Sequence, residues 1–210
     1  MRIRITFSKL GALRYTGHLD LHKLWERAAR RAELPLAYSQ GFHPQPKMNI
    51  AAALPLGFSS RCEVLDMRLE HEISLDGLRE KLQGTLPTGI QVTNVESIDE
   101  RAPTLQTQVL SAEYEVSLAG PSTSLRTDFG SEVKRKIESV LESESIIRTR
   151  RGKEYDLRPL IEALDLLDGE IFMKLAAREG ATGRPEEVLD VLGIAFEDTR
   201  IERTRLIFQA

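Results

Sequence analysis

The fold of this chain is decided by residues 18–32, HLDLHKLWERAARRA. At about 100° per residue, the apolar side chains of this stretch fall on one side of a helix, with the i, i+3, i+4, i+7 spacing of a core-facing stripe. The stripe consists of Leu21, Leu24, Trp25, Ala28 and Ala32. The pattern therefore predicts an amphipathic helix that packs its apolar side against a sheet.

The opposite side of the same helix is cationic. Within an arc of about 80°, it carries Lys23, Arg27, Arg30 and Arg31. Only Glu26 and Glu33 are near enough in sequence to offset these charges. A solvated outer face would explain them equally well, because charged outer faces are common on helices. The basic residues Arg14 and Lys47 in the flanking loops favour phosphate contact instead.

The segments around the helix alternate in a way that predicts strands and one more helix. The order is βαββαβ, the ferredoxin-like pattern of an antiparallel sheet with two helices on one face. Ser74 is expected to cap the second helix and Gly84 to end it. The expected elements are strands at 2–8, 48–54 and 62–69 with a turn at 57–60, a helix at 74–83 and a strand at 90–98.

The same order follows a polar segment at 99–108, which has no periodicity and contains Pro103. Pro185 and Gly193 stand at the first and last positions expected of a short helix, and Pro159 is expected to break a strand. We predict an α+β fold of two tandem ferredoxin-like halves, as domains 1–100 and 109–210. The second half should contain strands at 110–118, 145–150, 155–166, 170–177 and 200–208, and helices from Pro121-Ser122 to 142 and over 184–193.

Composition limits the classes of protein that the chain can belong to. With 210 residues, of which 41% are hydrophobic and 29% charged, it can form two globular domains. No apolar run approaches the roughly 18 residues of a membrane span, and the N-terminus lacks a signal-peptide core. We therefore expect a cytoplasmic protein with no membrane partner. The single cysteine, Cys62, cannot form an internal disulfide or a thiolate metal cage.

Charge is distributed unevenly along the chain. The net charge is −3, yet residues 1–50 hold nine basic against three acidic side chains, a balance of +6, and the rest carries −9. Three of the four histidines, His18, His22 and His43, also lie in this basic section. A localised basic surface on an acidic protein indicates a specific anionic partner rather than general polyanion binding.

The loop 41–47, GFHPQPK, is a second candidate recognition element. Its two prolines favour extended backbone and lack the backbone N–H that other residues donate. Gly41 can adopt φ values closed to other residues. Such a stiff loop could hold Phe42 and His43 for stacking on a base, with Lys47 reaching a phosphate. Alternatively, Phe42 fills the core and the prolines only direct the chain from helix to strand.

No self-contained catalytic centre is visible. His18 and His22 have a spacing found in zinc sites, but no Glu follows the first histidine, and only His43 or Asp20 could supply a third ligand. Asp20 is expected in the first turn, near the positive end of the helix dipole and able to accept backbone N–H bonds. Gly-rich phosphate loops and Gly-x-Ser-x-Gly elbows are missing. We predict no catalytic residue, no metal and no cofactor.

The chain contains the stretches Arg14–Leu21 (RYTGHLDL), Glu26–Ala28 (ERA), Arg30–Ala32 (RRA), Leu34–Lys47 (LPLAYSQGFHPQPK) and Ala53–Gly57 (ALPLG), followed by Glu63 and Asp66. Together they resemble the radical SAM-linked protein family, a bacterial domain of unknown function. The motif positions are His18, Asp20, Ser39, Gly41, Pro44 and Pro46. Many members have Ser in place of Gly17 and Asn in place of His43, which weakens a catalytic role for His43.

The resemblance implies a partner, because the family is encoded beside, or fused behind, a radical SAM protein that often has a B12-binding region. The present chain has no Cys-x3-Cys-x2-Cys motif, so any radical chemistry would belong to that partner. We expect a noncatalytic RNA-binding or substrate-presenting accessory of a radical SAM enzyme, in tRNA or rRNA modification.

Two groups of side chains would contact the RNA. Arg14, Lys23, Arg27, Arg30, Arg31 and Lys47 would bind phosphates, and Tyr38, Phe42 and His43 would offer rings or base-edge contacts. Two alternative functions fit the same residues. One is a metal-independent endoribonuclease in which His18 or His43 activates a 2′-hydroxyl. The other is a protein-docking module whose basic face binds an acidic patch of the radical SAM partner.

Overall fold

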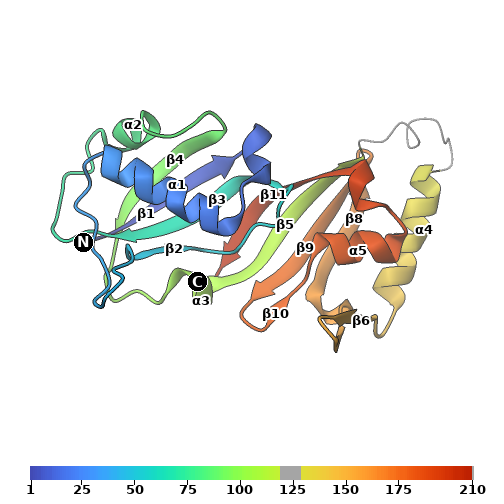
Figure 1. The fold of residues 1–210 in the computed structure, drawn as a ribbon. Helices are drawn as coiled ribbons and strands as arrows, with labels where there is room; N and C mark the ends of the chain where they lie inside the picture. Colours follow the sequence, from blue (N-terminus) through green and yellow to red (C-terminus); the bar gives the residue numbers. More distant parts are fainter. Residues whose placement is uncertain (119–128, 210) are drawn as a thin grey trace. The chain divides into compact units, whose positions relative to one another are not determined.

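The computed structural model describes residues 1–118 and 129–209 and has a mixed α+β fold (Figure 1). The chain forms two compact units, Met1–Val109 and Leu110–Ala210. Few helices accompany the strands, and neighbouring strands are mostly antiparallel. Within the described ranges, no helix is both long and apolar enough to cross a membrane.

The first unit has the predicted element order. Its sheet has the strand order β4-β1-β3-β2, and each of these pairs is antiparallel. In chain order, the elements are β1 (Arg2–Lys9), η1 (Gly11–Tyr15), α1 (His18–Arg31), β2 (Met48–Ile50), β3 (Ser59–Arg68), α2 (Leu78–Gln83), β4 (Ile90–Ile98) and α3 (Leu105–Gln108).

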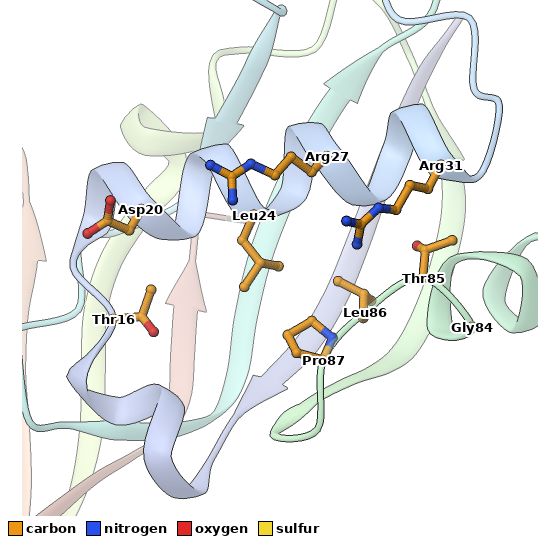
Figure 2. Close-up of a pocket in the computed structure, with 9 residues that line it drawn as sticks. All are labelled: Thr16, Asp20, Leu24, Arg27, Arg31, Gly84, Thr85, Leu86 and Pro87. Carbon is orange, nitrogen blue, oxygen red and sulfur yellow. The ribbon is translucent and has the colours of Figure 1, made fainter.

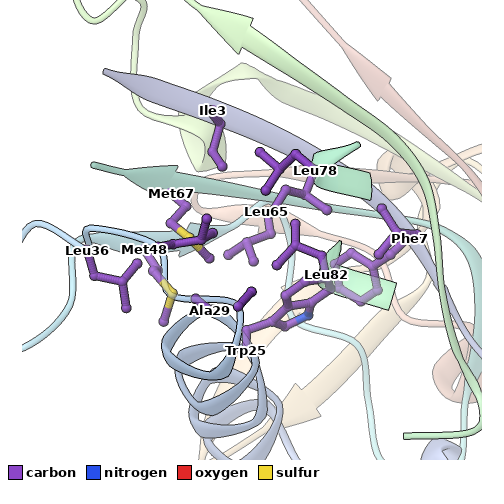
Figure 3. Packing of buried hydrophobic residues seen from close by; sticks show 14 of the residues in the cluster. Ile3, Phe7, Trp25, Ala29, Leu36, Met48, Leu65, Met67, Leu78 and Leu82 are labelled. Atoms are coloured by element: carbon purple, nitrogen blue, oxygen red, sulfur yellow. The ribbon is translucent and has the colours of Figure 1, made fainter. Parts of the chain in front are cut away.

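Helices α1 and α2 contribute to one core against the sheet. The predicted stripe of α1 is confirmed: Leu21, Trp25, Ala28 and Ala32 are buried, and Leu24 is partly buried. Trp25 meets Phe7 of β1 edge to face, with ring centroids 4.7 Å apart and planes at 63° (Figure 3). This aromatic pair fixes the rotation of α1 on the sheet and therefore decides which of its side chains point outward.

A buried ion pair ties the polar segment 99–108 to the first unit. Arg2 Nη2 donates to Asp66 Oδ2 at 2.6 Å, and the same guanidinium donates to the carbonyls of Ala102 and Pro103 at 2.7 and 3.0 Å. Leu105 of α3 is fully buried. The segment that the sequence suggested as a linker is thus part of the first unit, because its carbonyls satisfy a buried cation.

Two local predictions in the first unit need correction. Helix α2 begins at Leu78 and not near Ser74, because Gly77 stands before it with φ of 69° and interrupts helical backbone. Ser74 does not cap the helix; its hydroxyl donates to Asp76 Oδ2 at 2.9 Å. Strand β2 ends at Ile50, well short of residue 54. The chain bends at Ala51 and Ala52, directly after Ile50, so the strand stops there.

The second unit contains a four-strand path in the order β8-β9-β5-β11, with β10 also pairing with β9 and β6-β7 forming a separate hairpin. Pro159 breaks the expected strand as predicted, with a short 3₁₀ helix between β7 and β8. The elements are β5 (Val109–Leu118), α4 (Phe129–Glu142), β6 (Ile147–Arg150), β7 (Lys153–Asp156), η2 (Arg158–Leu160), β8 (Ile161–Leu167), β9 (Glu170–Arg178), β10 (Ala181–Thr182), α5 (Pro185–Leu192), η3 (Phe196–Asp198) and β11 (Thr199–Phe208).

The ends of the helices in the second unit follow the sequence in part. Pro185 opens α5, and Gly193 ends it in the left-handed conformation with φ of 69°, as predicted. Helix α4 ends at Glu142, also as predicted. The expected start of that helix at Pro121-Ser122 lies outside the described residues.

Candidate nucleic-acid interface

Helix α1 is held at its first turn by the loop that precedes it. Gly17 is the residue before the helix, and its carbonyl accepts the first helical bond from the Leu21 N–H at 2.9 Å. The buried ammonium of Lys9 donates to the Thr16 carbonyl at 3.1 Å. These bonds position the start of α1 relative to β1, so the outward side chains of the helix have a defined place.

A groove runs along one flank of α1, between the helix and the loop 84–87 that joins α2 to β4 (Figure 2). Its volume is about 430 Å³. The Thr85 hydroxyl lies 3.2 Å from the Ala28 carbonyl of α1 and 2.8 Å from the Leu82 carbonyl, which keeps the loop close to the helix. The groove is lined by Thr16, Asp20, Leu24, Arg27, Arg31, Gly84, Thr85, Leu86 and Pro87.

Arg27 and Arg31 lie one helical turn apart and both line the groove. Figure 2 shows their guanidinium groups leaning in the same direction, toward the N-terminal end of α1, as long side chains on helices commonly do. Arg30 lines a second, shallow hollow of about 360 Å³ together with the same two arginines. The three guanidinium groups therefore gather on one part of the helix surface.

These three arginines keep their positive charge available to a ligand. Across residues 1–118 and 129–209, no carboxylate forms an ion pair with Arg27, Arg30 or Arg31, and the side chains are exposed. Glu33, the first acid after Arg31 in the sequence, pairs weakly with Lys81 at 3.8 Å instead. Uncompensated cations that line a concave surface create a local positive potential that attracts anions.

The N-terminal end of the groove is chemically different. Asp20 lies there beside Thr16, and within the described part of the chain its carboxylate has no ion pair and no hydrogen bond. The expectation that it would accept backbone N–H bonds at the helix start is therefore not met. Between the ends, Leu24 and Leu86 supply apolar surface. The groove thus has an acidic end, an apolar floor and a cationic end.

The hairpin 38–46 lies on the other flank of α1. His22 Nε2 is 3.2 Å from the Met48 carbonyl, which places the start of β2 on the His22 side of the helix. Arg31 lies about 180° around the helix from His22, at about 100° per residue. Lys47 directly precedes β2 and is exposed. The structure therefore separates Lys47 and the hairpin from the groove arginines.

The hairpin itself is well defined by backbone bonds. Tyr38 and Pro46 form a β-bridge, and the N–H groups of Ser39 and Gln45 donate to the Gln45 carbonyl and the Ser39 hydroxyl at 2.8 and 3.0 Å. The motif residues Gly41, with φ of 128°, and Pro44 form its exposed tip. Phe42 is fully exposed, with a relative accessibility of 102%, which excludes the alternative that it fills the core. His43 is exposed beside it.

The other two predicted cations behave differently from each other. The Arg14 guanidinium stacks 4.7 Å above the ring of Tyr15 and donates to its hydroxyl at 2.8 Å. Lys23 is exposed one turn before Arg27 on the outer side of α1, and no ion pair engages it within the described residues. Lys23 can therefore extend the positive surface of α1, whereas Arg14 is partly occupied by its neighbour.

His18 opens α1 near another histidine and an acid. Partial desolvation lowers the pKa of His18, and the nearby His22 lowers it further, while Glu63 on β3 acts in the opposite direction. Among the residues that the structure describes, no group of three or more His, Cys, Asp or Glu side chains is arranged to hold a metal ion. At neutral pH, His18 is therefore a neutral polar group and adds little to the positive surface.

This pKa shift predicts a pH effect on stability. Because the pKa of His18 is lowered in the folded state, the unfolded chain binds the proton first as the pH falls below about 6.5. Stability should therefore fall through that range, down to the lowered folded value. Replacing His18 with Gln should reduce the loss of Tm between about pH 7.5 and about pH 5. The same change at the exposed His71 serves as control; an equal effect of both substitutions would contradict the assignment.

The loop 84–87 and Thr16 were not predicted as site residues. Gly84 was expected only to end a helix, and more than fifty residues separate this loop from Arg31. No local periodicity marks a loop that becomes one wall of a groove. The pairing of β4 with β1 brings the loop to α1, and that pairing exists only in the folded sheet.

Comparison with known protein families identifies the family of this chain. The family described as an uncharacterized protein conserved in bacteria, DUF2344, matches residues 2–185. The chain belongs to the DUF2344 family. The matched region contains the whole first unit after Met1, including α1, the groove and the hairpin. A comparison with curated proteins found no match. Membership in DUF2344 thus names a bacterial family but assigns it no activity.

Proposed function

We propose that this DUF2344 protein is a noncatalytic RNA-binding accessory that presents tRNA or rRNA to a radical SAM enzyme. The observation that supports this function best is the gathering of Arg27, Arg30 and Arg31 on one concave surface without carboxylate partners in the described chain. A planar guanidinium offers paired donors that match phosphate oxygens, so three of them form a suitable phosphate-binding surface.

The charge of the rest of the protein favours an RNA contact that is confined to the basic surface. The chain carries a net charge of −3, so an RNA would be repelled by much of the surface and attracted to the basic part. Phosphate contacts of this kind release counterions and make affinity depend strongly on salt. The proposed RNA therefore lies along α1, where Lys23 and Arg30 extend the positive surface past the groove.

The hairpin would form a second contact. Phe42 and His43 project into solvent at its tip, and exposed rings of this kind stack on unpaired bases. Tyr38 and Lys47 lie near the base of the same hairpin. Since the hairpin and the groove flank α1 on opposite sides, a single RNA strand would have to cross the outer side of the helix to reach both.

We also propose that the two units are tandem ferredoxin-like domains and that the partner is a radical SAM protein. Each unit has the strand order of a ferredoxin-like fold, with β4-β1-β3-β2 in the first and β11-β5-β9-β8 in the second; this order supports two tandem ferredoxin-like domains. The chain has a single cysteine, so an iron-sulfur cluster with three cysteine ligands would have to be held by the radical SAM partner. Both proteins would act in the cytoplasm.

The test is a salt titration of RNA binding with the full-length protein. Replacing Arg27, Arg30 and Arg31 together with Gln should weaken binding of bacterial tRNA or rRNA fragments on the order of 1,000-fold at low salt, since each hydrogen bond to a charged group contributes about 1.5 kcal/mol. The plot of log affinity against log salt should become shallower by about 2 for a single-stranded contact. Fluorescence anisotropy measures both quantities.

A matched control removes three exposed cations from the second unit, by changing Lys134, Arg135 and Lys153 to Gln. The two triple variants have the same net charge, so the control measures the non-specific part of binding. Equal losses in both variants, or unchanged RNA affinity in the arginine variant, would eliminate the proposed function.

A further inference from the structure

We infer that the groove beside α1 binds one nucleotide of the RNA, with its phosphate on Arg27 and Arg31 and its nucleoside donating hydrogen bonds to Asp20. This inference rests on the proposed RNA-binding function and gives it a specific recognition site. It assigns a role to the acidic end of the groove, which simple attraction of a polyanion leaves unexplained.

The dimensions and lining of the groove suit a nucleotide. Its volume of about 430 Å³ lies within the roughly 300–1,000 Å³ of small-ligand sites. Leu24 from α1 and Leu86 and Pro87 from the facing loop give it apolar surface between its two polar ends (Figure 2). The faces of nucleobase rings gain by covering apolar surface of this kind, while their polar edges stay free for hydrogen bonds.

The two ends select opposite parts of the ligand. Arg27 and Arg31 can only donate hydrogen bonds, whereas an ionised Asp20 can only accept them. Asp20 precedes Arg27 by seven residues, or about 10 Å of helix axis, and the Arg27 side chain leans toward it without forming an ion pair. A nucleotide spans such a polarity, because its phosphate accepts while its ribose hydroxyls and base N–H groups donate.

Phosphate alone would leave the Asp20 end of the groove without a partner. The exposed carboxylate lies about 10 Å of helix axis from Arg27, so it repels a phosphate bound to the arginines only weakly. A donor-rich group bound at that end turns the repulsion into a charge-assisted hydrogen bond. The sign of the effect of removing the Asp20 charge therefore distinguishes the two situations.

The test uses the full-length protein and isothermal titration with the four ribonucleoside 5′-monophosphates, their 2′-deoxy forms and inorganic phosphate. We expect at least one ribonucleotide to bind more tightly than inorganic phosphate. Asp20→Asn should weaken that binding by about 10-fold, in line with about 1.5 kcal/mol for a hydrogen bond to a charged group, without weakening phosphate binding. Glu72→Gln removes one negative charge from an exposed position of the same unit that does not line the groove, and it should change neither affinity.

The arms of the titration also identify what Asp20 contacts. If all 2′-deoxy forms bind more weakly, Asp20 accepts a hydrogen bond from the ribose. If Asp20→Asn removes a preference among the four bases, Asp20 accepts a hydrogen bond from a base edge. Either result supports the site. The inference is overturned if Asp20→Asn strengthens nucleotide binding, if phosphate binds as well as every nucleotide, or if no nucleotide binds in the millimolar range. Any of these three outcomes rules out the nucleotide site. The proposed RNA-binding function would still hold if the variant without Arg27, Arg30 and Arg31 loses RNA affinity.

Discussion

Replacing Trp25 with Ala is expected to destabilise the first unit by about 3–5 kcal/mol, the usual cost of removing a large buried aromatic side chain. Trp25 is fully buried and packs edge to face with Phe7. Its loss removes apolar contact area, the aromatic pair and the element that fixes the rotation of α1. The variant should also lose RNA affinity, because the arginines are placed by that rotation.

Urea unfolding followed by far-UV circular dichroism measures this effect. Trp25 is the only tryptophan in the chain, so tryptophan fluorescence cannot follow the unfolding of the Trp25→Ala variant. Leu19→Ala is the matched control, since Leu19 lies on the same helix and is largely exposed; it should change stability by less than about 0.5 kcal/mol. A Trp25→Ala effect as small as that of the control would refute the proposed anchoring of α1.

Replacing Asp66 with Ala should have a comparable effect, about 3–5 kcal/mol, because it leaves a buried cation without its partner. Asp66 and Arg2 are almost completely buried, and Asp66 also accepts two hydrogen bonds from Arg4 at 2.8 and 3.0 Å. This carboxylate raises the pKa of Arg4 through those bonds. Thermal or urea unfolding would show the loss directly.

A double-mutant cycle separates the ion pair from simple loss of packing. The variant with Arg2→Ala and Asp66→Ala should be more stable than the sum of the two single effects implies, because neither charge is left alone. Glu70→Ala, which removes an exposed acid just after β3, provides the baseline. Additive effects of the two single substitutions would argue against a coupled buried pair.

Local patterns predicted much of the fold correctly. The alternation of Ile3, Ile5 and Phe7 predicted β1, and the stripe containing Trp25 predicted both α1 and its buried side. These predictions depend on side chains a few residues apart, where the geometry of a strand or helix is fixed by the backbone. The prediction failed at Ser74, because the conformation of Gly77 decided where α2 begins.

The candidate site was predicted less completely. The sequence correctly placed Lys23, Arg27, Arg30 and Arg31 on the outer side of α1, but it could not show that Arg31 and Lys47 would lie on different flanks of the helix. It also grouped Arg14 with the free cations, whereas the structure pairs it with Tyr15. A run of basic residues in the sequence shows which cations the protein has. It does not show which side chains those cations contact in the folded protein.

Periodicities of two or 3.6 residues were enough to predict the order of the elements, the apolar stripe of α1 and its cationic outer side. Only in the folded protein do Asp20, Arg27 and Arg31 share a groove with Leu86. That juxtaposition requires β4 to pair with β1 and thereby to bring the loop 84–87 to the flank of the helix. Contacts over such sequence distances depend on the closure of the whole sheet, which no local pattern specifies.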